Sequence, residues 1–172
     1  MAVKEVKKYP DPFLRKRSEE VSENDDGIKA LIADMFETMD EEDGVGLAAP
    51  QIGISKRIIV ISVDEKGFDR LALINPVIEY FSDDTGTMEE GCLSVPGINA
   101  DVTRPTKVVV RGTTRNGRMV EISASGLLGR ALQHEIDHLN GTLFIDRLNE
   151  RERKRVENEL EELERQYTAI MK

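Results

Sequence analysis

The segment that most constrains the fold is GLLGRALQHEIDHLNG, residues 126–141. Ser125 precedes it as a helix cap, and Gly141 is placed to end the helix in a left-handed conformation. The apolar side chains between them fall on nearly every face of a helix, and they are Leu127, Leu128, Ala131, Leu132, Ile136 and Leu139. Because a helix that is apolar almost all round is buried, the sequence predicts a central helix with the rest of the fold packed around it.

Two further helices are predicted, one near each end of the chain. Residues 28–39 place apolar side chains at helical spacing, with Asn24 and Asp25 as caps and the Asp-Gly pair at 43–44 as the stop. The tail, residues 148–172, repeats the helical pattern. The pattern continues to Ile170, and the apolar stripe expected to dock on the body of the protein consists of Val156, Leu160, Leu163 and Tyr167.

Five runs in the middle of the chain are rich in β-branched residues and are bounded by Gly, Pro or Asn, as strands usually are. They lie at 57–63, 71–80, 98–103, 107–111 and 118–122. The Asn75-Pro76 pair is expected to bend the second run. A helix, a block of strands and then two helices indicate an α+β fold of mainly antiparallel sheets packed around the central helix.

Length and composition fit one domain, 1–172, because 39% hydrophobic and 33% charged residues are ordinary for a soluble globular chain. No signal peptide is expected, and the longest apolar runs are too short to span a bilayer. The lone cysteine, Cys92, excludes an internal disulfide and indicates a cytoplasmic location. A formal charge of −9 argues against broad nucleic-acid binding. We expect a monomer that does not bind membranes.

The central helix contains both histidines of the chain, His134 and His138, one turn apart. Residues four apart share one helix face, so the two imidazoles can bind the same metal ion. Glu135 is close enough to reach a metal-bound water without being a ligand, and it can move that water's proton as a general acid/base. The alternative is a buried helix whose histidines bond to the backbone.

A third ligand decides the class of metal site. An extended HExxHxxGxxH pattern would need histidine at position 144, which is Phe144. A downstream glutamate is an option, because Glu157, Glu159, Glu161 and Glu162 follow, but they lie on an exposed-looking helix. Cys92 in EEGCLSVPG is the better candidate, since two histidines, a thiolate and a water make a four-coordinate catalytic site. Iron(II), zinc, cobalt and nickel all suit this set.

Two other interpretations of Cys92 stay open from the residues alone. Single cysteines are often inert small hydrophobic residues. Cys92 could instead be a nucleophile activated by His134 or His138. A chelator would inactivate the metal enzyme, whereas an alkylating agent would inactivate the thiol enzyme.

Three ordered segments resemble the signature segments of the peptide deformylase family: GVGLAAPQ at 44–51, EGCLSVP at 90–96 and QHEIDHLNG at 133–141. The resemblance implies a hydrolase that removes the N-formyl group from the initiator methionine of newly made polypeptides. It implies Cys92, His134 and His138 as ligands of one divalent ion, usually iron(II), and Glu135 as general acid/base. Gln51 and the backbone N–H of Leu93 would bond to the formyl oxygen.

The resemblance also implies a binding site for the substrate. The backbone around Val45 and Gly46 would pair with the peptide as a strand does. Leu127, Val45 and the stem of Glu90 would form the pocket for the methionine side chain. From the residues alone, Val45 and Leu127 are expected in the core, and Glu90 is equally suited to an exposed loop.

Two positions depart from the family pattern. Arg130 stands where an apolar pocket residue is common, and we hypothesise that its charge reaches the pocket rim and favours substrates with acidic groups. Residues 97–100, GINA, do not match the expected substrate-contacting stretch.

The tail and two rival functions complete the sequence-based expectations. Some deformylases contact the ribosome through a basic C-terminal helix, and RERKR at 151–155 makes ribosome contact a hypothesis for this tail. The acidic residues that follow RERKR favour the alternative, a solvated helix. A metallopeptidase with a glutamate ligand would cleave unformylated peptides. A non-catalytic metal-binding module would bind an ion without turnover, although such a site has no need for Glu135.

Overall fold

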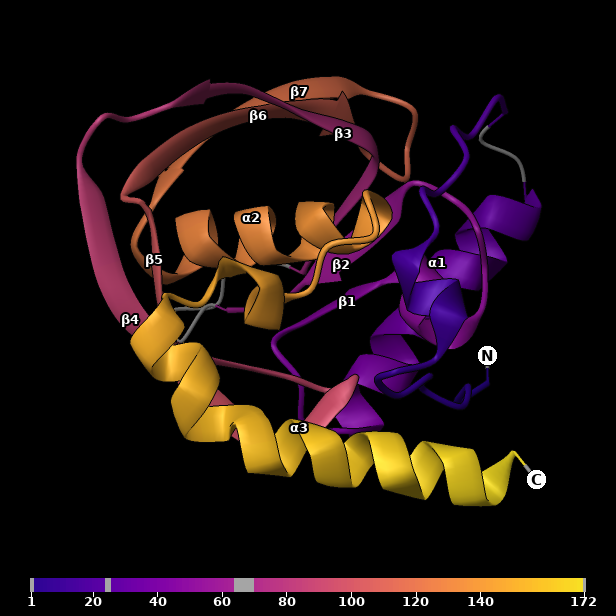
Figure 1. Ribbon diagram of the computed structural model, residues 1–172. Helices are drawn as coiled ribbons and strands as arrows, with labels where there is room; N and C mark the ends of the chain where they lie inside the picture. The colour runs from indigo at the N-terminus through magenta and orange to yellow at the C-terminus, as the bar shows by residue number, and fades with distance from the viewer. Residues whose placement is uncertain (1, 24–25, 64–69, 172) are drawn as a thin grey trace.

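The computed structural model describes residues 2–23, 26–63 and 70–171, and it has the α+β architecture that the sequence predicts (Figure 1). In chain order the elements are η1 (Pro12–Arg15), α1 (Asp26–Glu41), β1 (Gly46–Ala48), η2 (Ala49–Ile52), β2 (Ile58–Ile61), β3 (Leu71–Phe81), β4 (Thr85–Cys92), β5 (Val95–Pro105), β6 (Lys107–Thr113), β7 (Met119–Ser125), α2 (Gly126–Leu139), η3 (Phe144–Arg147) and α3 (Glu150–Ile170). All strand pairs are antiparallel. They form a five-stranded sheet in the order β1-β2-β3-β6-β7 and a separate hairpin of β4 and β5.

The central helix is confirmed, because α2 packs on β1, β2, β6 and β7 and lies inside the curved sheets (Figure 1). Every residue from Gly129 to Leu139 is buried. Ser125 is the N-cap residue, but its side chain makes no capping hydrogen bond. Gly141 follows the helix with φ +76°, and a Cβ there would collide with the carbonyl oxygen of Arg15. Only glycine therefore fits this end of the helix.

The five predicted strands are all present, and the bend in β3 is confirmed by a positive φ at Asn75 and a register shift after Ile74. Two strands were missed. β1 is only three residues long, and β4 is mostly exposed and polar, so neither shows a strand pattern. The proposed caps Asn24 and Asp25 lie outside the described residues.

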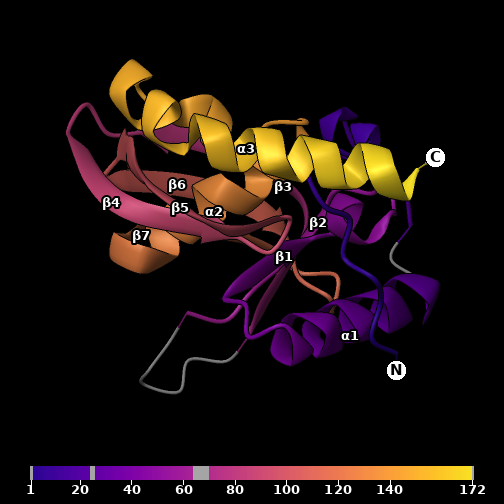
Figure 2. The ribbon, with the colours of Figure 1, turned by 60° about the horizontal axis from the view of Figure 1, so that its bottom comes forward.

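Both ends of the chain pack against the body of the protein, and the N-terminal end bonds to the segments that carry Gln51 and Cys92. In the N-terminal segment, the Lys7 N–H donates to the Gln51 carbonyl oxygen at 2.7 Å, and the Tyr9 N–H donates to the Ser94 carbonyl oxygen at 2.7 Å. At the other end, α3 runs along one side of the molecule, away from α1 (Figure 2). It docks through Val156 and Leu160, both buried, as the stripe in the tail predicts. No helix in the described part of the chain is both long and apolar enough to cross a bilayer.

Candidate active site

The fold brings Cys92, His134 and His138 together. Cys92 is the last residue of β4, and the histidines project from α2. The three potential ligand atoms lie within 4.8 Å of one another, and Cys92 Sγ is 3.3 Å from His138 Nε2. Tetrahedral ligands at about 2.0–2.3 Å from an ion are separated by roughly 3.3–3.6 Å, so the spacing is close to that of a bound set.

The second nitrogen of His134 has a carboxylate partner, as metal-binding histidines usually do. His134 Nδ1 lies 2.9 Å from Glu90 Oε1, which leaves Nε2 for an ion. Glu90 is buried. Arg104 Nε donates to Glu90 Oε2 at 2.6 Å, and Arg104 Nη2 donates to Glu90 Oε1 at 3.0 Å. Glu90 is therefore part of the site and is not an exposed loop charge.

The electrostatics of the metal-free chain favour a cation at this position. Burial opposes charge on His134, but Glu135, Cys92 and Glu90 together raise its pKa well above the ordinary value. Burial lowers the pKa of His138 well below the ordinary value, and His134 lowers it further, so His138 is neutral as a ligand must be. Two imidazoles, a thiol and nearby negative charge fit a divalent ion.

Glu135 provides a free carboxylate beside the three ligands. Its side chain is buried, and Oε1 has no hydrogen-bond partner among the described residues. Burial raises its pKa to about 7, while His134 opposes the shift. A carboxylate with a pKa near neutrality is suited to taking up and returning a proton. Gly46 on β1 lies against it, and a Cβ there would be 2.5 Å from Glu135 Oε2.

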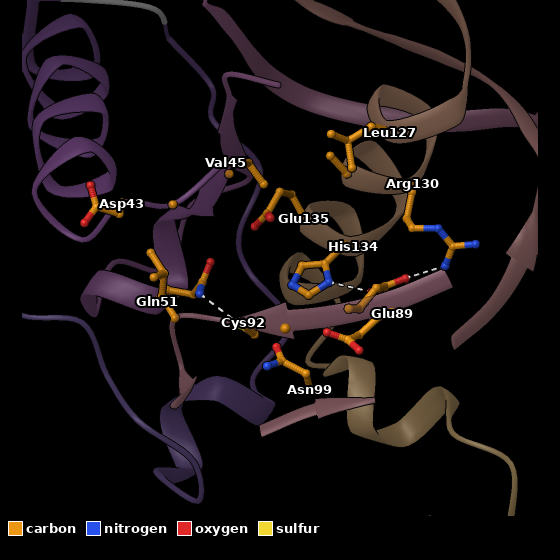
Figure 3. Close-up of a pocket in the computed structure, with 16 residues that line it drawn as sticks. Asp43, Val45, Gln51, Glu89, Cys92, Asn99, Leu127, Arg130, His134 and Glu135 are labelled. Carbon is orange, nitrogen blue, oxygen red and sulfur yellow. Dashed lines mark hydrogen bonds and ion pairs between the residues drawn. The ribbon is translucent and has the colours of Figure 1, made fainter. Parts of the chain in front are cut away.

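Gln51 points its side-chain amide group toward Cys92. The Ala48 N–H donates to Gln51 Oε1 at 2.9 Å, which fixes the amide so that Nε2 faces Ser94 Oγ at 3.0 Å and Cys92 Sγ at 3.5 Å. Figure 3 shows Gln51 and Glu135 on either side of the approach to Cys92. Gln51 is therefore a buried donor of the site and is more than a turn residue.

A pocket of about 350 Å³ opens over these residues and is also lined by Leu93. Val45 and Leu127 form part of its wall and are 50% and 49% exposed, so the expectation that they are core residues is wrong. The first turn of α2, with Leu127, lies at the pocket. The pocket rim includes Asp43, Glu89 and Asn99, to which the sequence assigned no role. Asn99 belongs to the stretch 97–100, for which the sequence predicts no match to the substrate-contacting stretch of the family.

A family model described as polypeptide deformylase matches residues 3–154. The chain belongs to the polypeptide deformylase family. A peptide deformylase from Stutzerimonas stutzeri is 44% identical over 166 residues, which cover 96% of this chain and 99% of that protein. One from Thermodesulfovibrio yellowstonii is 48% identical over 153 residues, or 87% of this chain and 91% of the relative. A solved peptide deformylase from Plasmodium falciparum superimposes with a TM-score of 0.91 at 46% identity, covering 95% of this chain and 97% of the other.

In this deformylase the charge of Arg130 does not reach the pocket rim. Arg130 is buried, and its guanidinium donates to Glu90 Oε2 at 2.6 Å and to two backbone carbonyl oxygens. Figure 3 shows the guanidinium turned away from Cys92 and Gln51. The hypothesis that Arg130 favours acidic substrates therefore has no support, because its charge is neutralised by Glu90 inside the protein.

Sequence reasoning missed three members of the ionic network around Glu90, namely Arg104, Asp137 and Arg147. Arg104 also donates to Asp137 Oδ2 at 3.0 Å, and Arg147 donates to both oxygens of Asp137. The signal for Asp137 was present, because a carboxylate on a helix that is otherwise apolar needs a cationic partner. The downstream glutamates of α3 are exposed and play no part in this deformylase site.

Proposed function

We propose that this enzyme removes the N-formyl group of newly made polypeptides at a centre where Cys92, His134 and His138 hold one divalent ion. The observation that carries the proposal is their convergence beside Glu135, a buried carboxylate with an unpartnered oxygen. We further propose iron(II) as the physiological metal, with zinc, nickel and cobalt as alternatives that the same ligands accept. The whole chain, 1–172, acts as one catalytic domain and as a monomer.

An ion held by Cys92, His134 and His138 would lower the pKa of a water molecule and polarise the formyl oxygen. Glu135 Oε1 would take a proton from the attacking water as the oxygen of that water bonds to the formyl carbon. The C–N bond then breaks, and Glu135 returns the proton to the leaving amine, so that formate and a free α-amino group result.

Negative charge develops on the formyl oxygen during the attack. Gln51 Nε2 and the backbone N–H of Leu93 donate to this oxygen in the proposed mechanism. The fixed orientation of Gln51, set by Ala48, supports this role because preorganised donors need no rearrangement as the charge forms. In a serine protease, removing one such donor costs about 2.7–4 kcal/mol.

The substrate lies in the pocket beside β1. The backbone around Val45 and Gly46 pairs with the peptide, and Leu127, Val45 and the stem of Glu90 surround the methionine side chain. The half-exposed positions of Val45 and Leu127 in the pocket wall support this assignment. Apolar walls bind a thioether side chain without requiring a fixed hydrogen-bond pattern.

Removal and return of the metal tests the proposed function. The enzyme, purified without oxygen, should contain about one divalent ion per chain and release formate from a formyl-methionyl peptide. A chelator should abolish turnover, and added iron(II), nickel, cobalt or zinc should restore it. Exposure to oxygen should inactivate the iron form, because the Cys92 thiolate is open to oxidation.

Three outcomes of this assay would contradict the proposal. Cleavage of unformylated peptides would identify a metallopeptidase. Metal uptake without turnover would identify a binding module. Inactivation by an alkylating agent together with resistance to chelators would make Cys92 a nucleophile.

The charge of the rim predicts a preference among formylated peptides. Asp43 and Glu89 lie on opposite sides of Cys92 (Figure 3), and neither has a cationic partner among the described residues. Because one exposed ion pair contributes about 0.2–1 kcal/mol, peptides with lysine after the formyl-methionine should have a KM about 1.4-fold to fivefold lower than peptides with glutamate there.

The double variant Asp43→Asn, Glu89→Gln is the control for this preference. It should remove the difference in KM between the two peptides, as should about 1 M salt, which shortens the screening length to about 3 Å. A difference that survives both changes would show that other residues set it.

Contact between α3 and the ribosome stays a prediction. The exposed face of α3 pairs its own charges, with Arg155 bonded to Glu152 and Arg165 bonded to Glu162. This pairing supports a solvated helix, as the mixed charge of the tail indicates.

A further inference from the structure

Arg130 lies on α2 one turn before His134, and the proposed mechanism gives it no role. Its side chain is 8% exposed, and three hydrogen bonds hold its guanidinium. Nη1 donates to Glu90 Oε2 at 2.6 Å and to the Val102 carbonyl oxygen at 2.9 Å, and Nη2 donates to the Gly86 carbonyl oxygen at 2.9 Å. A buried cation needs such partners, because losing one of them leaves a buried charge without compensation.

The first effect is on Glu90. Its Oε2 accepts from Arg104 Nε and Arg130 Nη1, and its Oε1 accepts from Arg104 Nη2 and bonds to His134 Nδ1. Arg104 is itself bonded to Asp137 Oδ2 on α2 at 3.0 Å, so it already restrains the Glu90 carboxylate from one side. A second cation at Oε2, from another element, fixes the carboxylate so that Oε1 stays directed at His134.

The second effect is on the backbone. Gly86 lies on β4, the strand that ends at Cys92, and Val102 lies on the paired strand β5. Arg130 lies on the helix that carries both histidines. One planar guanidinium thus joins the element that supplies the thiol to the element that supplies the imidazoles.

We infer that Arg130 is a positioning residue for the metal centre, holding Glu90 against His134 and fixing the β4–β5 hairpin to α2. The inference rests on the proposed metal site. Arg130 lines the pocket, and its replacement by methionine keeps an unbranched apolar stem while it removes every donor.

Cobalt(II) binding to the full chain without oxygen tests the inference. The dissociation constant is measured by competition with a chelator, and the absorption spectrum of the bound cobalt reports the ligand geometry. Arg130→Met should weaken cobalt binding by about 10-fold to 100-fold, the usual cost of losing an outer partner of a ligand, and should shift the spectrum. Arg130→Lys keeps a cation without the planar fork and should fall between wild type and Arg130→Met.

Arg147→Met is the matched control, because Arg147 belongs to the same network but contacts only Asp137 in it and has a half-exposed side chain. It should change cobalt affinity by no more than about twofold. If Arg130→Met folds and binds cobalt with the wild-type constant and spectrum, the inference is wrong and Arg130 serves packing alone. If Arg130→Met does not fold, unchanged cobalt binding by Arg130→Lys overturns the inference in the same way. Failure of the wild-type chain to bind cobalt would instead refute the proposed metal site.

Discussion

Replacing Glu135 with glutamine should lower kcat/KM on a formyl-methionyl peptide by about 10²–10⁴-fold, with wild-type metal content. Glutamine fills the same volume, but its amide cannot take up the proton of the attacking water or return it to the amine. The metal should remain because Glu135 lies outside the group formed by Cys92, His134 and His138. Formate release and metal analysis on the same preparation measure both parts of the result.

Glu37→Gln is a suitable control for this substitution. Glu37 on α1 also has a buried oxygen without a hydrogen-bond partner among the described residues, yet it is not part of the pocket. Its replacement should leave turnover unchanged. Loss of the metal from Glu135→Gln, or retention of most of its activity, would contradict the assignment of Glu135 as the proton carrier.

Replacing Cys92 with alanine should abolish turnover by removing the ion. Two imidazoles alone give an incomplete set, so the affinity for the metal should fall by more than the roughly 100-fold that loss of an outer partner can cause. The substitution leaves the fold intact, since Cys92 is only partly buried at the end of β4. Competition with a chelator measures the affinity, and thermal unfolding of the metal-free proteins checks the fold.

Cys92→Ser tests whether the loss of metal comes from removing the sulfur as a ligand. A serine hydroxyl is a weaker ligand that stays in the same place, so some zinc binding should survive while iron binding is lost. If Cys92→Ala bound the ion as tightly as the wild type, the sulfur would not be a ligand. A carboxylate would then have to complete the site, and the metallopeptidase interpretation would return.

The sequence was sufficient to predict the elements with strong patterns. The all-round apolar pattern of 127–139 predicts the buried helix, and the spacing of its histidines predicts the face that meets Cys92. The two missed strands have different reasons, because β1 has only three residues and is too short to show a pattern, whereas β4 is long enough but lacks one. β4 reads TGTMEEGC, and Glu90 is its one buried residue, so it shows no alternation of polar and apolar side chains.

Pocket-wall residues could not be separated from core residues by pattern. Leu127 continues the apolar face of α2, yet it is half exposed because the sheets do not cover the first turn of the helix. Similarly, the fate of Arg130 depends on its distance from Glu90, which is 40 residues away in the chain. Side-chain pairs of this kind are set by tertiary packing, which one sequence does not reveal.

The close approach of Gly46 to Glu135 has a consequence for resistance to inhibitors. A peptide-like inhibitor that pairs with the backbone at Gly46 would be most simply excluded by a new side chain at that position. Even a methyl group there would meet the Glu135 carboxylate at 2.5 Å, so the change that blocks the drug would also displace the group needed for turnover. Escape by this route should therefore carry a severe loss of fitness, which makes backbone pairing at Gly46 a durable feature to build into such compounds.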